Sequence, residues 1–150
     1  MIGTVLTLKG SDTFREKLRG MGRSALPALA EALTIEFEAV IEDAKDNYVP
    51  TVSTNLKGSG HVYPPMLTPN SVIVVGGFGN AASKYAKRTH DNPRAGKTGG
   101  ISPQGRRYKK WSRVGEYKFL SKPLRRRAKG LDRRVWKTIE RWWMPILGGR

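Results

Sequence analysis

The chain has 150 residues, the length of one compact domain. Hydrophobic residues make up 38% of it, and it contains 17 glycines and 9 prolines. Soluble domains usually contain about 45–50% apolar residues, so we expect a modest core with long irregular segments. This composition argues against a full-length doubly wound enzyme, and we predict a single domain over residues 1–150.

The charge is strongly positive and unevenly distributed. There are 28 basic and 12 acidic residues, which gives a formal net charge of +16. Residues 1–90 carry ten bases and eight acids, whereas residues 91–150 carry eighteen bases and four acids. A chain of this kind is expected to meet a polyanion, an acidic protein or an anionic membrane, and its second part is the region that would do so.

The absence of cysteine excludes disulfides, thiolate metal sites and cysteine nucleophiles. The first ten residues have neither a basic region nor a long apolar stretch, so we expect no signal peptide. No apolar run approaches the 18 or so residues of a membrane span. We therefore predict no membrane partner.

A strand and two helices are predicted in the first 50 residues. Residues 2–9 are rich in β-branched and apolar side chains and favour a strand. Ser11 and Asp12 offer an N-cap for a short helix over 13–19, and Ser24 offers one for the next helix. Apolar residues then recur at spacings of three and four, which predicts one buried stripe on a helix of about 24 residues. The stripe comprises Leu26, Leu29, Leu33, Phe37, Val40, Ile41, Ala44 and Tyr48.

The opposite face of this helix carries Ile35 near the small residues Ala28, Ala32 and Ala39. One interpretation is a solvated or half-buried surface. The other is a subunit contact, because small residues let another chain approach closely. Ile35 is the candidate subunit-contact residue.

The middle of the chain is predicted to be mostly strand and loop. Residues 51–60 read as a polar loop, 61–63 as a short strand, and 71–75 as a buried strand ending at Gly76-Gly77. Residues 81–88 fit a short helix or an extended edge. Residues 91–112 lack apolar periodicity and predict a long basic loop that is mobile until a partner orders it. Its partner- or polyanion-contact candidates are Arg94, Lys97, Arg106, Arg107, Tyr108, Lys109, Lys110 and Trp111.

The C-terminal part predicts a strand over 117–120 and one amphipathic basic helix over 121–143, with Ser121 as its cap. Its apolar stripe is Leu124, Ala128, Leu131, Val135, Ile139 and Trp142. Three interpretations stay open: a core helix with a solvated basic back, a helix that binds a polyanion or protein partner, and a membrane-surface helix. The contact candidates are Arg125, Arg126, Arg127, Arg133, Arg134, Trp136 and Trp143. The whole order of elements predicts an α+β fold, with a small, mostly antiparallel sheet packed against two long helices.

Motifs that suggest catalysis are incomplete. Residues 77–82 read G-x-G-x-x-A after a strand, but no second strand with an acidic residue follows at the required distance. Residues 96–98 read Gly-Lys-Thr, but Asp91 occupies the position where a P-loop has its first glycine. His61 and His90 are the only histidines, and the adjacency of His90 and Asp91 argues against a catalytic dyad. We therefore predict no enzyme activity, no cofactor and no metal site.

Three segments, in order, resemble a known family. Residues 47–59 (Asn-Tyr-Val-Pro-Thr-Val-Ser-Thr-Asn-Leu-Lys-Gly-Ser) are similar to the proline-valine, threonine-glycine-x-leucine-arginine, serine loop of the small neck and tail-completion proteins of tailed bacteriophages. Residues 83–90 resemble the tyrosine-alanine segment of that family. Residues 116–124 resemble its phenylalanine-leucine, proline-leucine entry into a last helix. The order and spacing of the three across residues 24–143 carry the resemblance.

The resemblance implies a structural virion protein that forms a homo-oligomeric ring at the head–tail junction. Its partners would be the portal or connector and the tail, with phage DNA as a further candidate contact. It would be assembled in the host cytoplasm and located in the neck or tail of the virion. The alternative is a basic nucleic-acid-binding protein that uses its C-terminal half, although no recognisable DNA- or RNA-binding motif is present.

Overall fold

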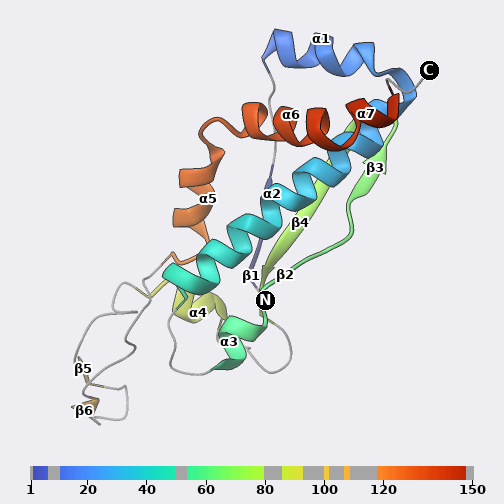
Figure 1. Ribbon diagram of the computed structural model, residues 1–150. Helices are drawn as coiled ribbons and strands as arrows, with labels where there is room; N and C mark the ends of the chain where they lie inside the picture. The colour runs from blue at the N-terminus through green and yellow to red at the C-terminus, as the bar shows by residue number, and fades with distance from the viewer. Residues whose placement is uncertain are drawn as a thin grey trace.

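The computed structural model describes residues 2–6, 11–49, 54–79, 86–92, 100–101, 107–108 and 118–147. The fold is α+β, as predicted: a small antiparallel sheet packs against helices, and the long helix α2 (Ala25–Asn47) runs along it (Figure 1). A pair of two-residue strands, β5 (Gly100–Ile101) and β6 (Arg107–Tyr108), lies within the predicted basic loop.

The sheet is built around β4 (Ser71–Phe78). The N-terminal strand β1 (Ile2–Leu6) pairs with its second half, from Ile2 opposite Phe78 to Leu6 opposite Val74. β2 (His61–Val62) and β3 (Met66–Thr68) also pair with β4, and the register shifts by one residue between them. That extra residue is a β-bulge at Pro64–Pro65, where the chain cannot donate ladder hydrogen bonds.

β4 is longer than predicted because it continues through Gly76-Gly77 instead of ending there. A Cβ atom at Gly77 would overlap the carbonyl of Ile2, and one at Gly76 would lie 2.9 Å from the carbonyl oxygen of His61. The missing side chains therefore allow the neighbouring strands to approach. Strand β3 is a further element that the sequence analysis did not predict.

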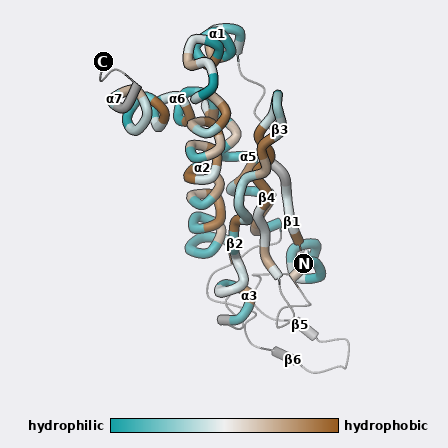
Figure 2. Tube along the Cα trace, turned by 90° about the vertical axis from the view of Figure 1, so that its right-hand side faces the viewer, coloured by the Kyte–Doolittle hydropathy of each residue, from teal (hydrophilic) through white to brown (hydrophobic). Residues whose placement is uncertain are grey.

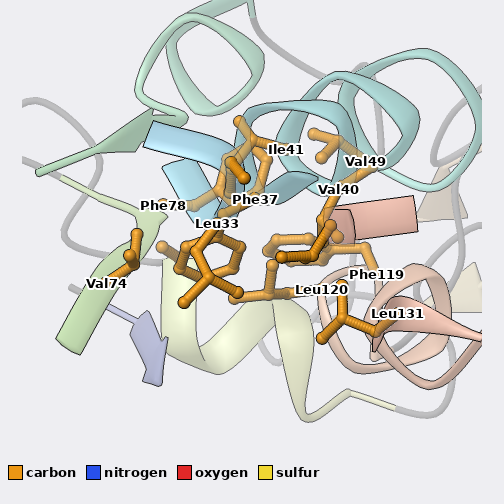
Figure 3. Packing of buried hydrophobic residues seen from close by; sticks show 14 of the residues in the cluster. Leu33, Phe37, Val40, Ile41, Val49, Val74, Phe78, Phe119, Leu120 and Leu131 are labelled. Carbon is orange, nitrogen blue, oxygen red and sulfur yellow. The ribbon is translucent and has the colours of Figure 1, made fainter. Parts of the chain in front are cut away.

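Helix α2 confirms the predicted stripe. Leu33, Phe37, Val40, Ile41 and Ala44 are at most 2% exposed. They pack against Val74 and Phe78 of β4 and against Phe119 and Leu120 (Figure 3). The Ser24 side chain makes no capping hydrogen bond, and a 3-10 turn (Gly22–Ser24) precedes the helix instead.

Two short helices and a turn lie near the lower end of α2 in Figure 1, and they differ in part from the elements predicted for these segments. α3 (Thr54–Gly58) lies inside the predicted polar loop, and α4 (Ala86–His90) overlaps the segment expected as helix or edge. Residues 118–120 form a turn, with Lys118 at φ 56°, so the predicted strand over 117–120 is wrong in its described part. At the other end, α1 (Asp12–Gly20) is capped by Ser11, whose hydroxyl accepts from the Phe14 amide.

The predicted C-terminal helix over 121–143 is wrong as a single element. It consists of α5 (Ser121–Ala128) and α6 (Leu131–Trp142), followed by α7 (Met144–Leu147). The break falls at Gly130, whose φ of 66° is left-handed, a conformation that glycine adopts without a Cβ penalty. As a result Leu131, Val135 and Ile139 are buried, whereas Ala128 and Trp142 are exposed.

Candidate partner-binding surface

Helices α5 and α6 bring the basic residues of the C-terminal part against α2 (Figure 1). The side of α2 that meets them carries acidic residues. Arg126 forms an ion pair and a hydrogen bond with Asp43, whose side chain is only 7% exposed. This hydrogen bond, together with the charge of Asp43, raises the pKa of Arg126. Arg126, whose own side chain is 59% exposed, therefore links α5 to α2 through the buried Asp43 carboxylate.

Glu36 is the centre of a second set of contacts. Its side chain is 10% exposed and accepts a hydrogen bond from Arg134 Nε at 2.8 Å, and the Arg127 guanidinium lies 3.8 Å away. Arg134 also donates to the carbonyls of Lys129, at 2.8 Å, and of Arg127. Because these carbonyls belong to the end of α5, Arg134 stabilises the break between α5 and α6 and ties it to α2.

The two candidate tryptophans also contact the protein's own helices. Trp136 packs edge-on against Phe14, with ring centroids 6.4 Å apart, and Lys17 Nζ lies 4.6 Å from its ring. Trp143 Nε1 donates to Glu31 Oε2 at 2.7 Å. The structure thus gives an internal role to Arg126, Arg127, Arg134, Trp136 and Trp143, all of which the sequence analysis offered as partner contacts.

The other side of α5 and α6 remains exposed and basic. We call Arg125, Lys129, Arg133, Lys137 and Arg141 the basic stripe, because these residues follow one another at intervals of four and all are exposed. Within the described part of the chain none of the five forms an ion pair; Arg141 lies over the Trp142 ring at 5.5 Å. Of the predicted contacts on these helices, only Arg125 and Arg133 belong to this stripe.

The sequence analysis placed Ile35 on one face of α2 with Ala28, Ala32 and Ala39, and the structure shows that these residues differ in exposure. Ile35 is 39% exposed, as a subunit-contact candidate should be. Ala28 and Ala32, however, are at most 1% exposed. These small residues do permit another helix to approach closely, but the approaching helices belong to the same chain. Helix α2 packs against α5 and α6, and its alanines join the same core cluster as Leu131 and Val135. Ile35 is left at the border of the covered face.

Most of the basic loop lies outside the described residues. This applies to the candidates Arg94, Lys97, Arg106, Lys109, Lys110 and Trp111. For Arg107 and Tyr108 the backbone is described, as strand β6. The mobility of residues 91–112 stays a prediction.

His90 joins α4 to the beginning of α5. His90 Nδ1 lies 2.8 Å from Asp91 Oδ1, and Nε2 lies 3.1 Å from Ser121 Oγ. Adjacency in the sequence, which argued against a catalytic dyad, thus does not prevent a hydrogen bond between His90 and Asp91. The imidazole is 7% exposed and stacks edge-on against Phe119, and the His90 carbonyl accepts from the Lys118 amide at 2.6 Å.

The hydrogen bond from His90 is the main cause that lowers the pKa of Asp91. The order carboxylate, imidazole, hydroxyl is that of a catalytic triad. Here Nε2 joins α4 to Ser121 at the start of α5, whereas Nδ1 faces Asp91, the next residue in the chain, so we interpret the group as a structural link.

The described ranges contain no group of three or more His, Cys, Asp or Glu side chains arranged to hold a metal ion. They also contain no helix with the length and hydropathy needed to cross a bilayer.

The acidic partners Glu31, Glu36 and Asp43 were missed by sequence reasoning. Glu36 and Asp43 are seven residues apart and lie on one side of α2, and this spacing was the available signal, whereas Glu31 lies about 140° from Glu36 around the helix. Comparison with known proteins adds no assignment, because no family model, curated protein or solved structure matches the chain.

Proposed function

We propose that this protein is a structural component of a tailed-bacteriophage virion. It forms a homo-oligomeric ring at the head–tail junction, in the neck or at the end of the tail, and links the portal-side connector to the tail. In this role it needs no catalytic site and no cofactor.

The observation that carries the proposal is the convergence of the three family-like segments in one core. Val49 and Leu56 belong to the first segment, Ala86 to the second, and Phe119 and Leu120 to the third. All five are at most 2% exposed and belong to a single hydrophobic cluster. Segments far apart in the sequence thus form one packed unit, which supports reading them together as one family pattern; residues 50–53, 83–85 and 116–117 of these segments lie outside the described residues.

The decisive experiment is disruption of the gene in a phage that encodes this chain. We expect DNA-filled heads and separate tails in electron micrographs, since the ring would join the two. Complementation with the parent gene should restore joined virions. Complete, infectious virions from the disrupted phage would overturn the proposal.

A second function, binding of nucleic acid, is favoured by the basic stripe, whose bases form no ion pair with any residue that the structure describes. Affinity for duplex DNA through this stripe should fall steeply with salt, because each neutralised phosphate releases counterions. Replacing Arg133, Lys137 and Arg141 with glutamine should reduce the log–log slope by about 2 to 3. The matched control replaces Arg15, Arg19 and Arg23, three exposed bases elsewhere, and removes the same charge. Equal slopes for the two variants would mean that only net charge matters.

A further inference from the structure

The hairpin formed by β2, β3 and β4 is the least charged part of a highly charged chain. From Gly58 to Ser83 there is no Asp, Glu, Lys or Arg, although the chain has 28 basic and 12 acidic residues. The tip of the hairpin, residues 63–73, is built from apolar and small polar residues around a turn at Pro69-Asn70. We call residues 63–73 the hairpin arm.

The hairpin arm exposes apolar side chains on both of its faces. Met66 is 54% exposed and Leu67 is 49% exposed. They are neighbours in β3, so their side chains point to opposite faces of the strand. Tyr63, at the bulge, is 40% exposed and stacks on His61. Although Val72 of the arm packs against the core, Met66 and Leu67 leave apolar area exposed on both faces of β3.

A second exposed apolar surface lies where α6 ends and α7 begins. Trp142 is 55% exposed and Met144 is 44% exposed. In Figure 2, α6 and α7 lie on one side of α2 and the hairpin on the other. The two surfaces therefore cannot meet within one chain, but they can meet between two copies.

Each chain carries both exposed apolar surfaces, so a second copy of this chain can supply the apolar counterpart that the hairpin arm does not meet within its own chain. Two copies that each carry +16 repel one another, and contact is least costly through a surface that has no charge. The hairpin arm is such a surface, and it can approach Trp142 beside Arg141 without placing like charges together. The prolines at 64, 65 and 69 lack an N–H, which disfavours addition of a further strand and leaves side-chain packing as the mode of contact.

We propose that the hairpin arm of one copy docks on the Trp142–Met144 surface of the next copy. Such a contact joins unlike surfaces, so it is heterologous and generates a closed ring when the rotation between copies closes. The inference rests on the proposed ring and names the surfaces that build it.

The absence of cysteine makes a cross-linking test direct. The double variant Met66→Cys/Met144→Cys should form a ladder of disulfide-linked multimers when the purified chain is oxidised. Each single variant should give at most a trace of dimer, because position 66 meets 144 and not another 66. The control Met66→Cys/Asn55→Cys places the second cysteine on exposed α3, near the other end of α2 from α7 (Figure 1), and should give no ladder.

A second measurement does not depend on cysteines. Met66→Ser/Leu67→Ser should raise the dissociation constant between copies about tenfold or more, measured by light scattering over a concentration series. Its melting curve should stay close to that of the parent, because both side chains are exposed. The matched control is Ile35→Ser, which removes exposed apolar surface from α2 and should leave the dissociation constant unchanged.

The outcomes separate the arm contact from the ring. Multimers of the parent without a 66–144 cross-link, or a larger effect of Ile35→Ser, would overturn the arm contact and leave the ring standing. A ladder from Met66→Cys alone would show an isologous contact and also overturn it. A parent chain that stays monomeric and uncross-linked contradicts the arm contact, whereas the ring itself is decided by the phage experiment.

Discussion

Both sides of the α5–α6 segment carry arginines, and the arginines of the two sides have different roles. On the side that meets α2, Arg126 forms an ion pair with Asp43, and Arg127 and Arg134 share Glu36. On the other side, the basic stripe has no acidic partner within the described residues. Arginines adjacent in sequence, such as Arg133 and Arg134, thus serve packing in one case and remain free for a partner in the other.

The comparison teaches that a cluster of bases in a sequence overstates the size of a binding surface. Some of the basic side chains hold α5 and α6 against α2, because a buried carboxylate needs a positively charged partner. Only the remainder is available to an outside polyanion or an acidic protein. Two predictions test this division and a third tests the neighbouring His90–Asp91 contact, in order of decreasing effect.

The largest effect is expected for Glu36→Gln. The substitution leaves the Arg127 and Arg134 guanidinium groups, about one-third exposed, without a neutralising charge. We expect the free energy of unfolding to fall by about 1–3 kcal/mol in urea titrations followed by circular dichroism. Glu38→Gln is the matched control, since Glu38 is exposed on the same helix, and it should change stability by less than about 0.5 kcal/mol. Equal losses for the two variants would refute the internal role of Glu36.

A smaller difference is expected between Arg134→Gln and Arg133→Gln. Arg134 contacts Glu36 and two carbonyls at the end of α5, whereas the Arg133 side chain is exposed. We expect Arg134→Gln to cost about 1–2 kcal/mol of unfolding free energy and to leave the salt dependence of DNA binding nearly unchanged. Arg133→Gln should do the reverse. A division of roles would be excluded if both variants changed both quantities alike.

The smallest effect concerns the link between α4 and the beginning of α5. The pKa of Asp91 is lowered, chiefly by its hydrogen bond to His90, relative to an unfolded value of about 3.9. A lowered pKa stabilises the fold above the unfolded value, and this contribution is lost as the pH falls through the folded value. The unfolding free energy of the parent should therefore decrease more steeply below about pH 4 than that of Asp91→Asn. Parallel curves from pH 5 to pH 3 would show that this hydrogen bond does not contribute.

Helical periodicity made α2 and its buried stripe predictable. The apolar residues recur every three or four positions, and a helix can bury such a pattern only on one side. The Ser11 cap, strand β1 and the α+β class were accessible for the same reason, because local patterning and local hydrogen bonding decide them. The valines and isoleucine of β4 made the strand recognisable, but its length was not predicted. The strand continues through Gly76-Gly77 because β1 approaches closely there.

By itself, the sequence determined where the charge lies, which helix face is apolar and that the hairpin is uncharged. Tertiary structure alone decided which arginines are neutralised, because Glu36 and Asp43 lie far from them along the chain and meet them only after α5 and α6 pack on α2. It also decided that Ala28 and Ala32 are covered and that Met66 and Leu67 are not. Burial and ion pairing depend on neighbours that are brought together by folding. The periodicity of one segment gives no information about those neighbours.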